Sequence, residues 1–125
     1  MPNEKRKYDI YDRIFNFIVM VLRFIDKLPR TYSNNVIIGQ ITRSVTSIGA
    51  NSQEADGSST KKDFLHCFTT VRKETKETVY WLQLIEKLNP KSSAEVTPII
   101  QDGNEIVAII STIMKNTLKN SSSKL

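Results

Sequence analysis

Two stretches of heptad-spaced residues, separated by a short polar break, constrain this chain most. In the first stretch the steps of three and four residues place one stripe on a single face of an α-helix, made of Ile38, Ile41, Val45, Ile48, Ser52 and Ala55. After the polar residues 56–60, the second stretch repeats this spacing with Phe64, Phe68, Val71, Thr75, Thr78, Leu82 and Ile85. Each stretch therefore predicts a helix with one largely apolar face.

We expect these two helices to fold onto each other as an antiparallel hairpin. In such a hairpin the position numbers of facing residues have a constant sum. One sum pairs Ile41 with Thr75, Val45 with Val71, Ile48 with Phe68, and Ser52 with Phe64. This register would place a small residue opposite a large ring near the turn.

Composition limits the fold class and the compartment. The 125 residues, 39% of them hydrophobic and 25% charged, fit one globular domain over residues 1–120 and a polar tail over residues 121–125. Only 4 Gly and 4 Pro, with little alternation of the strand type, predict an all-α protein. The lone cysteine, Cys67, cannot form an internal disulfide, and no secretory leader is evident, so we expect a cytoplasmic protein.

Helix start and stop signals place the first two helices. The first is predicted from Asp9 to Lys27, because Leu28 precedes a proline and is pushed out of the helical region. Ser33 or Asn34 is expected to cap the second helix, which continues to Ala55. The apolar run over residues 14–22 is shorter than the ~18 to 20 residues of a membrane span, so we interpret it as part of a core helix.

The last two helices have their own signals. Thr60 and Asp63 have the spacing of a capping box, which predicts the start of a third helix that ends near Leu88. The fourth helix is predicted to end near Leu118 and to start at Ser92 or Ser93, or else at Thr97 with Pro98 as its first helical residue. Four helices with short connections predict an antiparallel up-and-down four-helix bundle.

The first helix carries more apolar surface than one core face needs. One stripe consists of Ile10, Ile14, Phe17, Val21, Phe24 and Leu28, and an adjacent stripe consists of Tyr11, Phe15, Ile18, Leu22 and Ile25. The fourth helix is similarly rich in isoleucine. The excess predicts contacts between subunits of a homo-oligomer, and a thick monomeric core is the alternative.

Polar residues beside the two heptad stripes predict a clamp. In the hairpin, Arg43 faces the neighbourhood of Glu74, and Glu77 lies one turn further along the same side of the third helix. With Asn51 and Glu54, these residues form a candidate polar clamp that specifies how helices or subunits meet. A binding role for the same residues is the alternative.

Catalysis has little support in the sequence. His66 is the only histidine, and its neighbour Cys67 points about 100° away around the helix, so the two cannot act as a thiolate and base pair. Asp63 and His66 have the spacing of a di-iron ligand pair, but such a site needs a second histidine motif. We therefore predict no catalytic residue, no metal site and no cofactor.

The positive charge favours nucleic acid as a partner. The formal net charge is +5, and a basic surface attracts phosphates without reading sequence. The candidate phosphate contacts are Lys61, Lys62, Arg72, Lys73, Lys76 and Arg13. Two alternatives remain: a solvated face that only keeps the protein soluble, and a scaffold that binds a protein partner without intrinsic affinity for nucleic acid.

Several short motifs together resemble a known bacterial family. They are residues 43–51 (RSVTSIGAN), Glu54-Ala55, residues 59–64 (STKKDF), Glu74, Glu77-Thr78 and residues 80–82 (YWL). The chain is similar to four-helix-bundle proteins encoded by intervening sequences within 23S ribosomal RNA genes, and to the accessory variability determinants of diversity-generating retroelements. The resemblance implies a homopentameric ring with basic surfaces, accessory to ribosomal RNA or to a nucleic-acid enzyme such as a reverse transcriptase.

Overall fold

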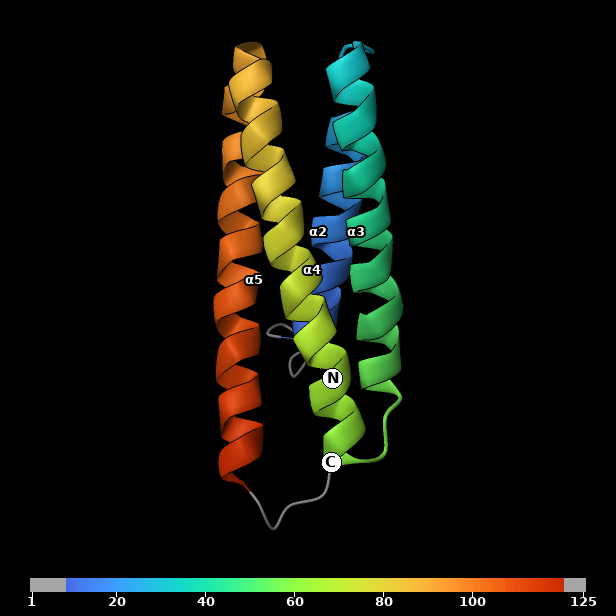
Figure 1. Ribbon diagram of the computed structural model, residues 1–125. Coiled ribbons are helices and arrows are strands. Elements are labelled where there is room, and N and C mark those ends of the chain that lie inside the picture. Colours follow the sequence, from blue (N-terminus) through green and yellow to red (C-terminus); the bar gives the residue numbers. More distant parts are fainter. Residues whose placement is uncertain (1–8, 121–125) are drawn as a thin grey trace, which may run out of the picture.

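Four long α-helices run alternately up and down in the computed structural model, which describes residues 9–120 (Figure 1). They are α2 (Ile10–Asp26), α3 (Tyr32–Asp56), α4 (Lys61–Leu88) and α5 (Ser93–Lys119), and the one-turn 3-10 helix η1 (Pro90–Ser92) precedes α5. This confirms the predicted all-α four-helix bundle. Residues 1–8 of the predicted domain and the predicted tail 121–125 lie outside the described residues.

Each helix packs against two neighbours, so that the four enclose one core. The neighbouring pairs are α2 with α3, α3 with α4, α4 with α5, and α5 with α2. The first predicted stripe of α2 is buried along its whole length, and Phe17 and Val21 are completely inaccessible. Burial of each such side chain contributes about 1.5–3 kcal/mol. Within the described residues, no helix combines the length and apolar character needed to cross a lipid bilayer.

Side chains at the helix starts explain where α2 and α4 begin. The Asp9 carboxylate accepts a hydrogen bond of 2.8 Å from the backbone N–H of Tyr11. The Thr60 hydroxyl accepts one of 3.1 Å from the N–H of Asp63, which is the hydroxyl half of the predicted capping box. Both helices therefore begin where the sequence predicts.

The cap of α3 was predicted wrongly. Thr31, not Ser33 or Asn34, caps the helix, because its hydroxyl accepts a hydrogen bond of 3.1 Å from the Asn34 N–H. Asn34 lies inside the first turn and is buried. Its side-chain amide is thereby free to bond outside its own helix.

The start of α5 follows one of the two predicted alternatives. The helix begins at Ser93, so the alternative start at Thr97 is wrong and Pro98 lies inside the helix. The Glu86 carboxylate accepts hydrogen bonds from the hydroxyls of Ser93 (2.7 Å) and Thr97 (3.1 Å). These two bonds attach the first turns of α5 to the end of α4.

The register of the α3–α4 hairpin differs from the predicted one. The buried hydroxyls of Ser44 and Thr78 are 2.7 Å apart, whereas the predicted register places Arg72 opposite Ser44. Asn34 and Asn89 form a second direct link with nearly the same offset. With the Arg43 contacts to Glu74 and Glu77, these links have position sums from 117 to 123, against 116 for the predicted pairing of Val45 with Val71, so the two helices are shifted by about half a heptad.

Of the four glycines, Gly103 has the closest neighbours from other helices. A Cβ atom added at Gly103 would lie 2.6 Å from Cγ2 of Val79 and 3.1 Å from the ring of Phe17. At Gly49 the nearest atom, Cδ1 of Ile18, would be at an ordinary 3.4 Å. The absence of a side chain at Gly103 therefore lets α5 pack closely against both α2 and α4.

Candidate functional site

A cluster of polar side chains joins α3 to α4 near the middle of the bundle. Nη1 of Arg43 lies 3.4 Å from Oε1 of Glu74, and its Nη2 forms an ion pair with Oε2 of Glu77. The Trp81 indole N–H donates a hydrogen bond of 3.0 Å to the same oxygen of Glu77. Gln40 accepts a bond of 3.3 Å from Nε of Arg43. The residues Gln40, Arg43, Glu74, Glu77 and Trp81 are named the Arg43 cluster below.

The structure brings together three of the five residues predicted for the clamp. Asn51 bonds within its own helix, to the carbonyl oxygen of Ser47 at 3.0 Å. Glu54 is exposed and lies beside the α3–α4 connection, where it lines a hollow with Asp63 and His66. Trp81 was missed as a member, although its spacing of four residues from Glu77 places the two side chains on one helical face.

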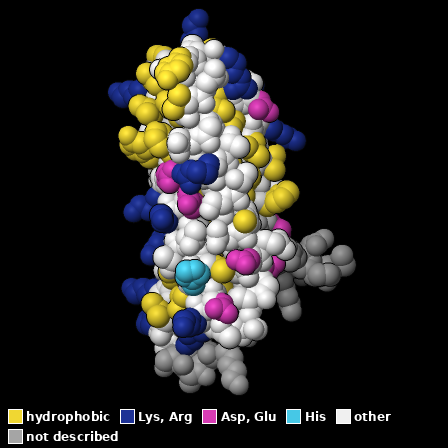
Figure 2. All heavy atoms as spheres, turned by 45° about the vertical axis from the view of Figure 1, so that its right-hand side comes forward, with side chains coloured by type: hydrophobic (Ala, Val, Ile, Leu, Met, Phe, Trp, Pro, Cys, Tyr) yellow, Lys and Arg dark blue, Asp and Glu magenta, His cyan; other side chains and the backbone are white. Residues whose placement is uncertain are grey.

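A row of exposed side chains follows the outer face of α4. Its members recur at steps of three and four, and none is Asp or Glu: Lys62, His66, Thr69, Lys73, Lys76, Tyr80, Gln83 and Lys87. The row spans about 37 Å of helix and is named the α4 stripe below. Figure 2 shows Lys and Arg side chains following the edge of the molecule on this side.

The α4 stripe borders a basic hollow between α4 and α5. The hollow, of about 440 Å³, is lined by Arg72, Ser111, Met114, Lys115, Leu118 and Lys119. Nη1 of Arg72 donates a hydrogen bond of 3.3 Å to the Ser111 hydroxyl, which fixes the guanidinium at the inner wall. The charged residues of this hollow are Arg72, Lys115 and Lys119, with no carboxylate among the lining residues, so the hollow favours the binding of an anion.

Two other predicted phosphate contacts have partners inside the protein. Arg13 donates a hydrogen bond of 2.6 Å to Asp102 and pairs with Glu105, which raises the pKa of its guanidinium. Its charge is compensated by two carboxylates of α5, and its side chain is 36% exposed. Nζ of Lys61 donates to the backbone oxygen of Asn120 at 2.6 Å, whereas Lys62 is exposed.

The second predicted stripe of α2 is only partly covered. Phe15 is 67% exposed, and Tyr11, Ile18 and Leu22 are partly buried at the edge of the core. Ile25, the last member, is buried within its own chain. The described chain therefore leaves apolar surface along α2, as the sequence predicts.

The hollow at the α3–α4 connection carries the groups that were weighed for catalysis. Its lining includes Asp63, His66 and Cys67. Burial raises the pKa of the Cys67 thiol, and nearby Glu54 and Asp63 act in the same direction, so the reactive thiolate is disfavoured. Among residues 9–120, no group of three or more His, Cys, Asp and Glu is arranged to hold a metal ion.

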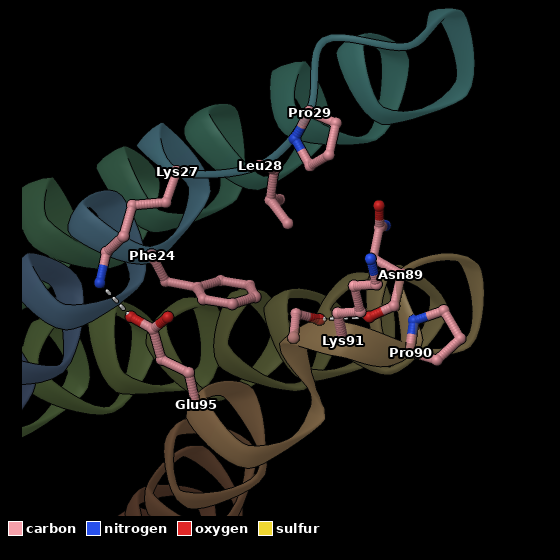
Figure 3. Close-up of a pocket in the computed structure, with 9 residues that line it drawn as sticks. Phe24, Lys27, Leu28, Pro29, Asn89, Pro90, Lys91 and Glu95 are labelled. Atoms are coloured by element: carbon pink, nitrogen blue, oxygen red, sulfur yellow. Dashed lines mark hydrogen bonds and ion pairs between the residues drawn. The ribbon is translucent and has the colours of Figure 1, made fainter.

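A third hollow lies at the end of the bundle where the α2–α3 and α4–α5 connections meet (Figure 3). Asn34 and Asn89 exchange two amide hydrogen bonds of 2.9 and 3.0 Å beside it. The Asn34 amide also donates to the Pro29 oxygen at 2.8 Å. Lys27 of α2 pairs with Glu95 of α5 at one rim. None of these contacts was predicted from the sequence.

Comparison with known proteins is consistent with the bundle. The family model of the 23S rRNA-intervening sequence protein matches residues 6–112. A crystal structure of a protein with unknown function from the S23 ribosomal protein family of Bacteroides thetaiotaomicron is 31% identical, with a TM-score of 0.76 over 85% of this chain and 95% of that one. No curated protein matches. This chain belongs to the 23S rRNA-intervening sequence protein family.

Proposed function

We propose that this protein is a non-enzymatic homo-oligomer that binds nucleic acid through the α4 stripe and the neighbouring α4–α5 hollow. The α4 stripe is the observation that carries the proposal, because four lysines follow one exposed helical face without an intervening carboxylate. Arg72, Lys115 and Lys119 extend the positive surface toward α5. Contacts of this kind bind phosphates and do not read base sequence.

Binding over a salt series tests the proposal. We expect generic single-stranded RNA, duplex RNA and duplex DNA to bind tightly at low salt, and the affinity to fall steeply as salt is added. The double variant Lys73→Gln/Lys76→Gln should weaken all three and lower the salt slope by about 2. Arg30→Gln, which removes an exposed charge from the α2–α3 connection, is the matched control. Absence of binding at low salt would reject the proposal.

Self-association is the second part of the proposal. The exposed Phe15 and the partly covered Tyr11, Ile18 and Leu22 provide apolar surface for a second copy. An assembly of five subunits is what the family resemblance implies. Light scattering should give a mass several times that of one chain, and Phe15→Glu should reduce it. Monomer alone at micromolar concentration would reject self-association.

A protein scaffold is the alternative function, and one specific observation favours it. Large side chains are exposed where α3 begins and α4 ends: Tyr32 (86%), Val36 (52%), Tyr80 (57%) and Leu88 (50%). Such side chains suit a protein partner, for example a nucleic-acid enzyme. If nucleic acid does not bind at low salt, this reading takes the place of the first.

A further inference from the structure

We propose that the hollow between the two loop connections binds a small molecule with a flat apolar body and one anionic group, of the aromatic carboxylate class. The hollow has a volume of about 380 Å³, which lies within the range of small-ligand pockets. Figure 3 shows the Phe24 ring pointing between the Leu28–Pro29 segment and the Asn89–Pro90 turn. The proposal does not depend on nucleic-acid binding.

The walls of the hollow are held in place before any ligand arrives. Pro29 and Pro90 restrict the backbone of the two connections. The buried Asn34 side chain ties them together through Asn89 and the Pro29 oxygen. Little conformational entropy is therefore lost by the two connections when a ligand binds, which favours binding.

The lining combines apolar surface with an excess of positive charge. Phe24, Leu28, Pro29 and Pro90 provide the apolar part. The charged side chains of the lining are Lys27, Lys91 and Glu95. The ammonium group of Lys27 is paired with the Glu95 carboxylate. No ion pair joins Lys91 to a carboxylate of the described residues. An anionic group on the ligand can therefore pair with Lys91, whereas a cationic ligand would meet net positive charge.

A titration of the whole protein with 2-naphthoate, monitored in ¹⁵N TROSY spectra, tests this site. We expect shifts at Leu28, Lys91 and Glu95 and a dissociation constant on the order of 1 mM or tighter, as about 13 heavy atoms allow. The neutral analogue 2-naphthalenemethanol should cause shifts at the same residues and bind several-fold more weakly. Lys91→Gln should abolish this preference for the anion, while Lys87→Gln, on the outer face of α4, should keep it.

Three results would overturn the proposal. The first is the absence of shifts around the hollow at millimolar 2-naphthoate. The second is a shift pattern centred on the exposed α2 surface around Phe15. The third is equal binding of the anionic and neutral probes by the unmodified protein, or an anion preference that survives in a folded Lys91→Gln variant. Nucleic-acid binding can succeed or fail independently of all three.

Discussion

The hydroxyl groups of Ser44 and Thr78 lie 2.7 Å apart, and both residues are completely buried between α3 and α4. Each hydroxyl also lies within hydrogen-bond distance of a carbonyl oxygen of its own helix, Ser44 of Ile41 and Thr78 of Glu74, so one hydroxyl can donate to its carbonyl while the other donates across the interface. The pair is a polar link inside the buried part of the α3–α4 interface. It therefore favours one register of the hairpin, because any other register would leave the hydroxyls facing apolar groups.

The first prediction concerns this pair. Ser44→Ala and Thr78→Val should each lower the free energy of unfolding by about 1 kcal/mol, because each leaves one partner hydroxyl without the other. The double variant should lose less than the sum of the two. Urea unfolding of all four proteins measures this coupling, and strictly additive losses would show that the hydroxyl pair contributes nothing.

The second prediction concerns the link between the two loop connections. Asn34→Ala removes the buried amide that bonds Asn89 and the Pro29 oxygen, so stability should fall by about 2 kcal/mol. Asn35→Ala changes an exposed amide next to it in the same helical turn and should cost little. Thermal unfolding of both variants makes the comparison. Equal effects would contradict a structural role for Asn34.

The third prediction compares two glycines inside helices. Gly103→Ala should lower stability by about 1–3 kcal/mol, since the new methyl group would meet Val79 and Phe17 too closely. Gly39→Ala should raise it by about 1 kcal/mol, because no atom of another helix lies within 4 Å of the added Cβ and alanine favours the helix. Denaturant melts of the two variants should therefore shift in opposite directions. A stabilising Gly103→Ala would show that α5 can move away without cost.

The fourth prediction tests the clamp interpretation of the Arg43 cluster. Arg43→Met leaves the carboxylates of Glu74 and Glu77 without their shared cation, so we expect a loss of about 1 kcal/mol and an altered assembly. Fluorescence of Trp81, the only tryptophan, should report the change through its bond to Glu77. Lys73→Met removes a charge from the exposed α4 stripe and serves as the control. Unchanged unfolding and assembly in Arg43→Met would remove the clamp idea.

The fifth prediction concerns high pH. Burial raises the pKa of Tyr11 to about 12, and the carboxylates of Asp56 and Asp9 act in the same direction. Between pH 10 and 12 the unfolded chain loses the phenol proton while the folded chain keeps it, so stability falls as pH rises. Tyr11→Phe should lose less stability between pH 9 and 11 than the unmodified protein. Tyr32→Phe, altered at a side chain that is 86% exposed, should behave like the unmodified protein.

Heptad spacing was enough to predict the helices but not their alignment. The stripe that includes Val45 and the stripe that includes Val71 are both buried, except for Ile38 and Phe64, which are partly buried. A shift of three or four residues brings each stripe position opposite the next one again, so several registers satisfy the same pattern. Polar pairs such as Ser44 with Thr78 and Asn34 with Asn89 distinguish them, and spacing alone gives such residues no special weight.

Two factors determined which site residues could be predicted from the sequence: the length of the side chain and the separation of the partners along the sequence. Arg43 meets Glu74 and Glu77 despite the shifted register, because its long side chain spans more than one helical turn. Arg13 was interpreted as a phosphate contact because its partner Asp102 lies on a helix far away in the sequence. The loop hollow also depends on such a distant contact, between Asn34 and Asn89.

The seating of the Phe17 ring against Gly103 has a consequence for synthesis. During translation α2 leaves the ribosome long before α5, which covers part of its apolar face, has been synthesised. We expect the α3–α4 hairpin to form first. The apolar face of α2 would then stay accessible to chaperones until α5 has been synthesised and completes the core.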